Sequence, residues 1–187
     1  MSLFNDLMWT QFNATCTMLG YDPTSYPQFI RPLDYTESPA GLKDPHTNMV
    51  FYIVQFTDED INRQIDTIFS GNADPELVSK KVKYCRNLRM IWQTYGDDGF
   101  EWADKIRINL LTSDTVHDML KQHGISLIPD VSEPMYIPES IGEQWYKRYD
   151  LYADFNQLVV LEDTLPAVSG TDIIIETEKG VVGECSV

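Results

Sequence analysis

Apolar residues recur every three or four positions near the start of the chain, which is the spacing of an amphipathic helix. The run 3–19 has this spacing, and Gly20 follows where helices commonly end. The runs 100–111 and 114–124 repeat the pattern further along the chain. We therefore predict an N-terminal helix within residues 2–20 and two more helices in the middle of the chain.

Short polar side chains precede the two later helical runs. Asp97 or Asp98 can accept hydrogen bonds from the free N–H groups that begin the first run, with Phe100 and Ala103 among its buried positions. Ser113 or Asp114 can do the same for the second run. The sequence thus predicts a helix cap before each run.

Other segments alternate between apolar and polar residues, which is the period of a strand with one buried face. This pattern covers 80–95, where Arg89 falls on the polar side, and 145–161. The run 49–56 is apolar at nearly every position, which indicates a strand covered on both faces. A shorter strand is predicted at 172–176.

The alternation within 145–161 separates two kinds of side chain. Trp145 falls on the apolar side, and tyrosines and charged residues fall on the other. Because tyrosine is enriched at protein interfaces, the polar side is a candidate subunit or partner interface. An ordinary cross-strand ion pair explains Arg148 and Asp150 equally well. The predicted interface residues are Tyr146, Arg148, Asp150, Tyr152 and Asp154.

The remaining segments lack a clear period. We expect a proline-rich loop at 21–48, with at most an edge strand near 28–33, and a mostly extended loop at 125–140. The segment 58–79 is an acidic insertion in which a short helix is possible near 59–69. A glycine-containing acidic segment, 178–187, is predicted to be a flexible tail.

The length of the 145–161 strand bears on assembly. Seventeen residues at ~3.3 Å each span about 56 Å, whereas a compact domain of this length has a diameter of about 40 Å. The strand must therefore bend or protrude with a partner as a β-ribbon. A protruding ribbon needs a surface to lie against, which favours an oligomer.

Composition indicates a folded protein with a strongly acidic surface. The 187 residues are 43% hydrophobic and 12% aromatic, which suits one domain spanning 1–187. The 29 acidic and 14 basic residues give a net charge of −15. This balance argues against binding to nucleic-acid phosphates, and it fits a solvated surface, a basic partner or a surface that DNA passes without sticking.

The pattern of reactive side chains favours neither catalysis nor cofactor binding. Three cysteines and three histidines occur without ligand-like spacing, so we expect no disulfide framework and no metal site. Paired acids are adjacent and lie in turns, unlike catalytic carboxylates in separate environments. Gly96 and Gly99 could hold an anion between a strand and a helix, but Asp97 and Asp98 oppose a phosphate there.

We also expect no membrane segment and no export signal. Apolar runs fall short of the ~20 residues that a membrane helix needs. The start, Met-Ser-Leu-Phe-Asn-Asp, lacks the basic flank and long apolar run of a secretion signal.

Several short motifs occur in an order that resembles a known family. They are Tyr95-Gly96, Ala103-Asp104, Gly124-Ile125, Pro138-Glu139 and the set Trp145, Arg148 and Asp150. Across about 29–178 the chain resembles tailed-bacteriophage neck and tail-terminator proteins. The resemblance marks Tyr95, Gly96, Pro138, Glu139 and Trp145 as structural-motif residues.

The resemblance implies an α+β subunit with a mixed or mainly antiparallel sheet, two or three helices on one face and a long β-ribbon. Such subunits form a ring, usually six-fold, that caps the tail tube, stops its polymerisation and joins it to the neck and head. The expected partners are further copies of this chain, the tail tube protein and a neck or head-completion protein. Genomic DNA would pass the lumen without specific binding, and the protein would belong to the virion after assembly in the host cytoplasm.

Three other interpretations remain open. A head-completion or neck adaptor protein on the portal side would form a twelve-fold ring more readily than a six-fold one. An acidic DNA-mimic inhibitor would bind a basic partner stoichiometrically. An enzyme of another type would require a pocket with perturbed titratable groups, for which the sequence offers no candidate set.

Overall fold

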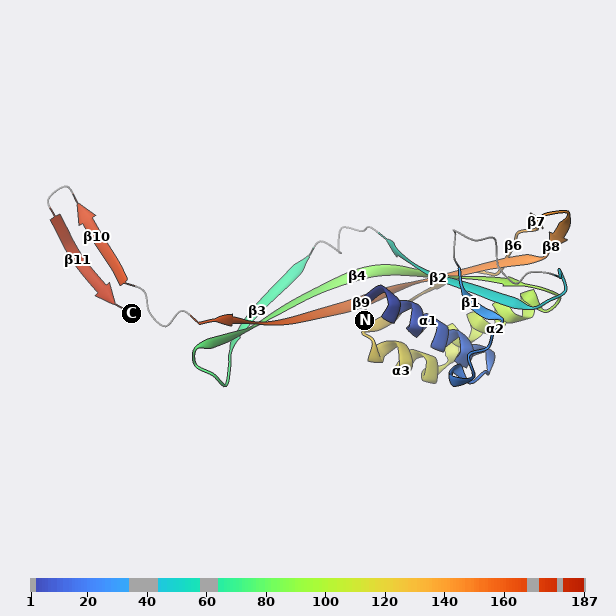
Figure 1. The fold of residues 1–187 in the computed structure, drawn as a ribbon, viewed down its shortest axis with the longest axis horizontal. Helices are drawn as coiled ribbons and strands as arrows, with labels where there is room; N and C mark the ends of the chain where they lie inside the picture. The colour runs from blue at the N-terminus through green and yellow to red at the C-terminus, as the bar shows by residue number, and fades with distance from the viewer. Residues whose placement is uncertain (1–2, 34–43, 58–63, 168–171, 178–179, 187) are drawn as a thin grey trace. The chain divides into compact units, whose positions relative to one another are not determined.

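The computed structural model describes residues 3–33, 44–57, 64–167, 172–177 and 180–186, with backbone only for the last two ranges (Figure 1). Its contacts divide the chain into two compact units. Unit 1 comprises Met1–Gln64 and Cys85–Val159, and unit 2 comprises Ile65–Tyr84 and Val160–Val187.

Unit 1 contains the three predicted helices. They are α1 (Leu3–Leu19), α2 (Gly99–Thr112) and α3 (Asp114–Gln122), with a short 3-10 turn, η1 (Pro23–Ser25), after α1. Ser113 caps α3 by accepting a hydrogen bond from the backbone N–H of Val116. The three helical runs and this cap are confirmed.

The strands form one seven-stranded sheet and two small two-stranded sheets. The main sheet has the order β1-β2-β4-β9-β5, with β3 also paired to β4 and β6 also paired to β9. Its strands are β1 (Ile30–Pro32), β2 (Met49–Thr57), β3 (Ile65–Gly71), β4 (Leu77–Tyr95), β5 (Ile125–Val131), β6 (Met135–Tyr136) and β9 (Arg148–Pro166). The small sheets pair β7 (Glu139–Ile141) with β8 (Gln144–Tyr146), and β10 (Asp172–Thr177) with β11 (Gly180–Ser186).

Antiparallel pairing dominates the main sheet. β2 pairs antiparallel with β4, β9 pairs antiparallel with β5, and β1 pairs parallel with β2. Between β4 and β9, Arg86 contacts Gln157 and Arg89 contacts Asp154. Residue numbers rise along β4 while those of their partners fall along β9, so these two strands are antiparallel. The sheet is therefore mixed but mainly antiparallel.

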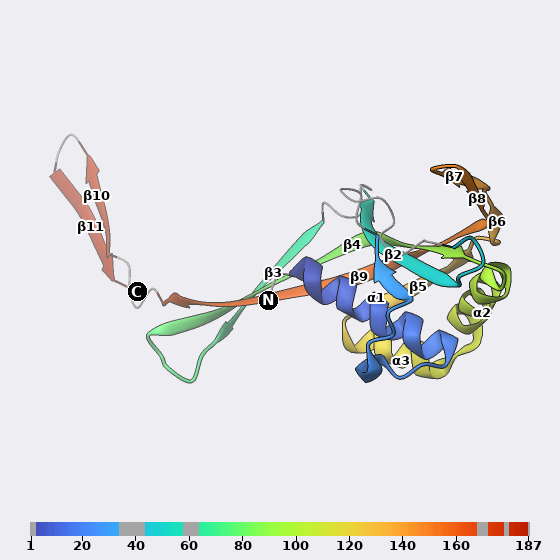
Figure 2. The same cartoon turned by 45° about the vertical axis from the view of Figure 1, so that its right-hand side comes forward.

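The helices of unit 1 lie on one face of its sheet, as both views show (Figures 1 and 2). The core lies between these layers, where side chains of all three helices meet alternate residues of β2, β4 and β9. Trp92 is fully buried there and donates its indole N–H to Thr15 Oγ1 of α1 at 2.8 Å. The α+β fold with helices on one face is confirmed.

A second, smaller apolar cluster lies on the opposite side of the sheet. Met49, Phe51 and Tyr95 pack there with Tyr146 of β8. Ile141 of the β7–β8 hairpin is half-buried against them. This hairpin therefore covers one end of the face that the helices leave open.

Unit 2 contains strands alone among its described residues. β3 pairs antiparallel with the first part of β4, from Ile65 opposite Tyr84 to Gly71 opposite Val78. The last part of β9 also belongs to unit 2, where Glu162 forms a 2.6 Å ion pair with Lys81. β10 and β11 pair with each other.

The prediction of a mostly extended loop at 125–140 is wrong, because the segment contributes β5, β6 and β7. Pro129 lies in β5, at an edge of the sheet. An edge strand needs N–H donors on one side only, so it tolerates a proline that a central strand would not. This proline therefore did not exclude a strand here.

The possible helix near 59–69 is also wrong over the described residues, since β3 begins at Ile65. Pairing with β4 decides the conformation, which the weak local pattern could not reveal. Residues 58–63 of the predicted acidic insertion lie outside the described residues, as do 34–43 of the predicted loop 21–48.

Two predicted details near the helices are wrong. Asp98 holds the N-cap position of α2, but its side chain accepts no hydrogen bond from the helix; its carboxylate accepts one from Asn48 instead. Phe100, expected in the buried stripe of α2, is exposed.

The segment expected as a flexible tail, 178–187, contains β11 paired with β10, while residues 178, 179 and 187 are not described.

Candidate interaction surface

The middle of the sheet in unit 1 has a face that α1, α2 and α3 do not cover (Figure 2). We call it the open sheet face and define it by neighbouring positions on β2, β4 and β9. Its residues are Ile53, Gln55, Arg89, Ile91, Tyr152 and Asp154. Both isoleucines are half-buried and Tyr152 is exposed, so the face offers apolar area flanked by charge.

Arg89 organises the charged part of this face. Its Nε and Nη2 donate to the two carboxylate oxygens of Asp154 at 2.7 and 2.8 Å. The guanidinium also lies 4.4 Å from the centre of the Tyr152 ring. Hydrogen bonding to Asp154 raises the pKa of Arg89 above its ordinary value. The contacts hold all three side chains in place before any partner binds, which reduces the entropy cost of binding.

A second charged cluster lies at the end of β9 nearest the β7–β8 hairpin. Arg148 donates from Nε and Nη2 to Asp150, both at 2.6 Å, and its Nη1 lies 3.5 Å from Glu139 Oε2. The same Glu139 oxygen accepts a hydrogen bond from the Tyr95 hydroxyl at 2.6 Å. Burial, together with this bond, raises the pKa of Tyr95 well above its ordinary value. The cluster thus joins β4, β7 and β9.

This cluster fixes a hairpin that exposes a tryptophan. Tyr146 of β8 is 4% exposed in the second apolar cluster, whereas its neighbour Trp145 is 70% exposed. Successive residues of a strand point to opposite sides, so anchoring Tyr146 turns Trp145 outward. An exposed tryptophan on a fixed hairpin is a strong candidate for contact with another protein.

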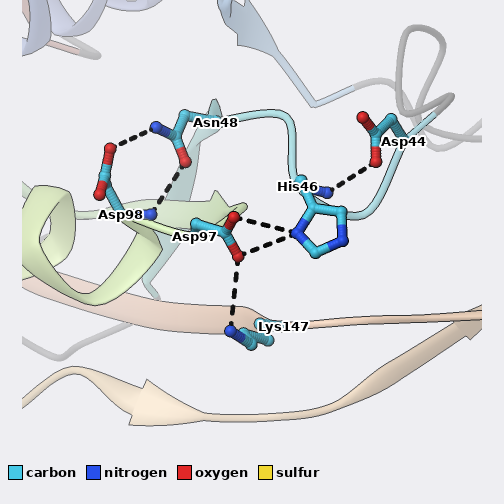
Figure 3. Close-up of polar contacts among 6 residues, drawn as sticks. All are labelled: Asp44, His46, Asn48, Asp97, Asp98 and Lys147. Carbon is cyan, nitrogen blue, oxygen red and sulfur yellow. Dashed lines mark hydrogen bonds and ion pairs between the residues drawn. The ribbon is translucent and has the colours of Figure 1, made fainter.

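Two loops meet beside this hairpin in a polar network (Figure 3). Asp97 accepts from His46 Nδ1 at 3.0 Å and lies 3.5 Å from Lys147 Nζ. The bond to His46 holds the pKa of the Asp97 carboxyl below its ordinary value. Asn48 is bound twice by Asp98, through its carboxylate at 2.7 Å and its backbone N–H at 3.0 Å.

Gly96 makes the close approach of these loops possible. Its φ is 99°, and a Cβ there would lie 2.3 Å from the Asn48 side chain and 2.7 Å from Asn48 backbone atoms. Only glycine adopts this positive φ without strain and also has no Cβ to clash with Asn48. The predicted Tyr95-Gly96 motif therefore ends β4 with a buried tyrosine and a tight turn.

The structure brings four of the sequence-predicted residues together, namely Tyr95, Glu139, Arg148 and Asp150. Tyr152 and Asp154 lie apart from them on the open sheet face. Pro138 lies between β6 and β7, immediately before Glu139.

The predicted sides of Trp145 and Tyr146 are wrong, since Tyr146 is the buried one. The reason is a break at Lys147 between β8 and β9, across which the alternation does not continue.

Arg89 is the residue that sequence reasoning missed. Its alternation had placed it on the polar side of 80–95, and Asp154 was on the polar side of its own strand. The alternation showed that each residue lies on the polar side of its strand. It could not show that the two residues lie opposite each other, because it does not give the register between the strands. The loop contacts of His46 and Asn48 had no signal in the sequence.

The arrangement suits binding through surfaces. Among the described residues, no group of three His, Cys, Asp or Glu side chains is placed to hold a metal ion. No helix in the described part of the chain is long and apolar enough to cross a membrane. The charged groups identified above are satisfied by partners within the fold.

The model of a family described as phage neck terminator protein matches residues 8–179 of this chain. A search of curated proteins gave no match. The matched range includes α2, α3 and all residues of the open sheet face.

Proposed function

The chain belongs to the phage neck terminator protein family and is a structural component of the virion, and from that premise we propose that it forms a ring that caps the tail tube. The ring stops tube polymerisation and joins the tail to the neck and head. The family match carries this proposal, and the resemblance of the sequence motifs supports a six-fold ring.

We assign the open sheet face to contact with the last ring of tail tube subunits. Its mixture of a tyrosine, two isoleucines and a paired arginine has the polar character of contacts between separately folded proteins. Contacts between copies of one chain are commonly more apolar. Trp145 would anchor the edge of the same contact, because tryptophan often supplies much of the binding energy at interfaces.

The net charge suits a passage for DNA. Six copies would carry 6 × −15 = −90 formal charges. Acidic residues lining a lumen would repel DNA phosphates, so the genome would slide through without specific binding. Neutralising lumen acids should then slow DNA ejection. Unchanged ejection would sink this part of the proposal.

A tube polymerisation assay tests the capping proposal. Tail tube protein assembled with this chain should give shorter tubes than tube protein alone, as measured by electron microscopy. Tyr152→Ala should weaken capping because it removes the ring that Arg89 packs against. Tyr21→Ala is the matched control, since Tyr21 has similar exposure (40% against 37%) but follows α1 and lies outside the open sheet face.

Tube lengths unaffected by the wild-type chain would contradict capping. Equal loss of activity in both tyrosine variants would contradict the assignment of the open sheet face. Binding to portal rings instead of tubes would favour a neck adaptor on the head side.

A further inference from the structure

The sheet edges of this chain are protected unequally. Exposed strand edges pair readily with other strands, and proteins commonly block them with proline or lysine. Within the main sheet the edge strand β1 carries Pro32 and the edge strand β5 carries Pro129. The sequence of β3, Ile-Asp-Thr-Ile-Phe-Ser-Gly, contains neither residue type. β3 therefore has an unprotected edge.

β3 is also an apolar strand that is exposed along its whole length. All seven of its residues are exposed, including Ile65 (62%), Ile68 (48%) and Phe69 (60%). Among the described strands it pairs with β4 alone, so its other edge keeps free N–H and C=O groups. A strand with this composition is suited to pairing with another strand.

The β10–β11 hairpin lacks a third strand among the described residues, just as β3 lacks a strand at its free edge. It forms a sheet of two strands, and no third strand pairs with it within the described residues. Isolated two-stranded hairpins are marginally stable in water and gain stability from a third strand. The sequence of β10 contains Ile173, Ile174 and Ile175, which favour strands and lack a blocking proline or lysine.

Charge favours contact between these two elements. β4, the partner of β3, carries Lys80, Lys81 and Lys83 within four residues, in a chain where acids outnumber bases two to one. The two hairpin strands carry Asp172, Glu176 and Glu184 and no basic residue. A lysine-rich strand beside β3 thus suits an acidic hairpin.

We propose that the β10–β11 hairpin of one copy adds to the free edge of β3 in a neighbouring copy, so that each contact in the ring joins two different surfaces. This inference rests on the proposed ring. A contact between unlike surfaces can repeat around a closed ring, whereas β3 paired with β3 would stop at a dimer. Strand addition supplies backbone hydrogen bonds and removes both exposed edges.

Two full-length variants test the proposal from its two sides. Ile174→Pro removes a backbone donor from β10, and Ile174→Val is its control. Ile68→Asp places a negative charge on β3 opposite Lys81, where it faces the acidic hairpin, and Ile68→Thr is its control. Each test variant should fail to form rings on tail tubes by electron microscopy, and each control should form them.

Mixing the two test variants gives a sharper result. The Ile174→Pro copy keeps an intact β3 edge, and the Ile68→Asp copy keeps an intact hairpin, so one contact can form. The mixture should give heterodimers by native mass spectrometry, while neither variant alone forms dimers. Hydrogen exchange should show that β3 amides gain protection in wild-type rings, and that unit 1 is equally protected in all monomers.

Three results would overturn the proposal. Rings formed by either test variant would show that the contact is not needed. A mixture that gives no heterodimers would show that an intact β3 edge and an intact hairpin do not pair, provided that unit 1 keeps its exchange protection. If the wild-type chain forms no ring, the proposed function itself fails and this inference falls with it; rings without protection of β3 remove the inference alone.

Discussion

At the scale of single residues, Gly96 is the position where backbone conformation and packing coincide. Gly96→Ala should destabilise unit 1 by about 1–3 kcal/mol from the left-handed backbone alone, with a further cost from the clash with Asn48. Gly142→Ala is the matched control, because Gly142 has a φ of 63° and no atom within 4 Å of the added Cβ. Urea unfolding of both variants measures the difference. Equal losses would show that the close approach to Asn48 contributes nothing.

Cys16 supplies a prediction about pH. Burial raises the pKa of its thiol to about 11 from an ordinary 9.0. A raised pKa means that the folded state favours the neutral thiol, so this contribution to stability is complete below pH 9 and is lost towards pH 11. Stability measured by urea unfolding should fall across that interval, and the fall should be smaller in Cys16→Ala. An identical pH profile in both proteins would contradict the prediction.

The same thiol should resist alkylation in the folded protein. Cys85 is exposed and Cys16 is fully buried, so iodoacetamide at pH 8 should label Cys85 first. Labelling of Cys16 should require unfolding, as peptide mapping by mass spectrometry would show. Equal labelling rates in native buffer would contradict the placement of Cys16 on the buried face of α1.

At the scale of elements, the β7–β8 hairpin is held by the Tyr95–Glu139 hydrogen bond, the Arg148–Glu139 ion pair and the buried ring of Tyr146. Tyr95→Phe removes the donor to Glu139 and should cost about 1 kcal/mol. Hydrogen exchange should become faster in 139–146, while α1 and the centre of the sheet keep their rates. Tyr136→Phe, on an exposed tyrosine of β6, is the control and should change neither. Unchanged exchange in Tyr95→Phe would mean that the Tyr95–Glu139 hydrogen bond does not anchor the hairpin.

The sequence predicted the elements whose pattern is long and regular. The three helical runs and the strand at 80–95 follow from apolar period alone, because one face of each is buried in the same core. β5 and β3 were missed, since pairing at an edge of β9 and β4 stabilises them more than their own sequences do. Local pattern carries no information about such partners.

The candidate site was predictable in part. Alternation placed Arg148, Asp150, Tyr152 and Asp154 on one side of a strand, which matches their polar contacts in the structure. The break at Lys147 reversed the sides of Trp145 and Tyr146, and no residue there signals a break as a glycine or proline would. The pairing of Arg89 with Asp154 required the register between β4 and β9, which alternation cannot give.

At the scale of the whole molecule, charge should control its behaviour towards DNA. With a net charge of −15, the chain should show no measurable binding to duplex DNA in low salt, where attraction to phosphates is strongest. A filter-binding titration at 10 and 150 mM salt measures this. Binding that weakens with salt would show that a local basic surface, such as Lys80, Lys81 and Lys83 of β4, outweighs the net charge, and would contradict a lumen that DNA passes freely.

The central claim is that this chain ends the tail tube as a ring. The most direct test is electron microscopy of tail tubes incubated with the purified chain, with the symmetry determined at tube ends. We predict an added six-fold ring at one end of each tube and no further growth when tube protein is added. A twelve-fold ring, attachment to portal instead of tube, or tubes that continue to grow would contradict the account.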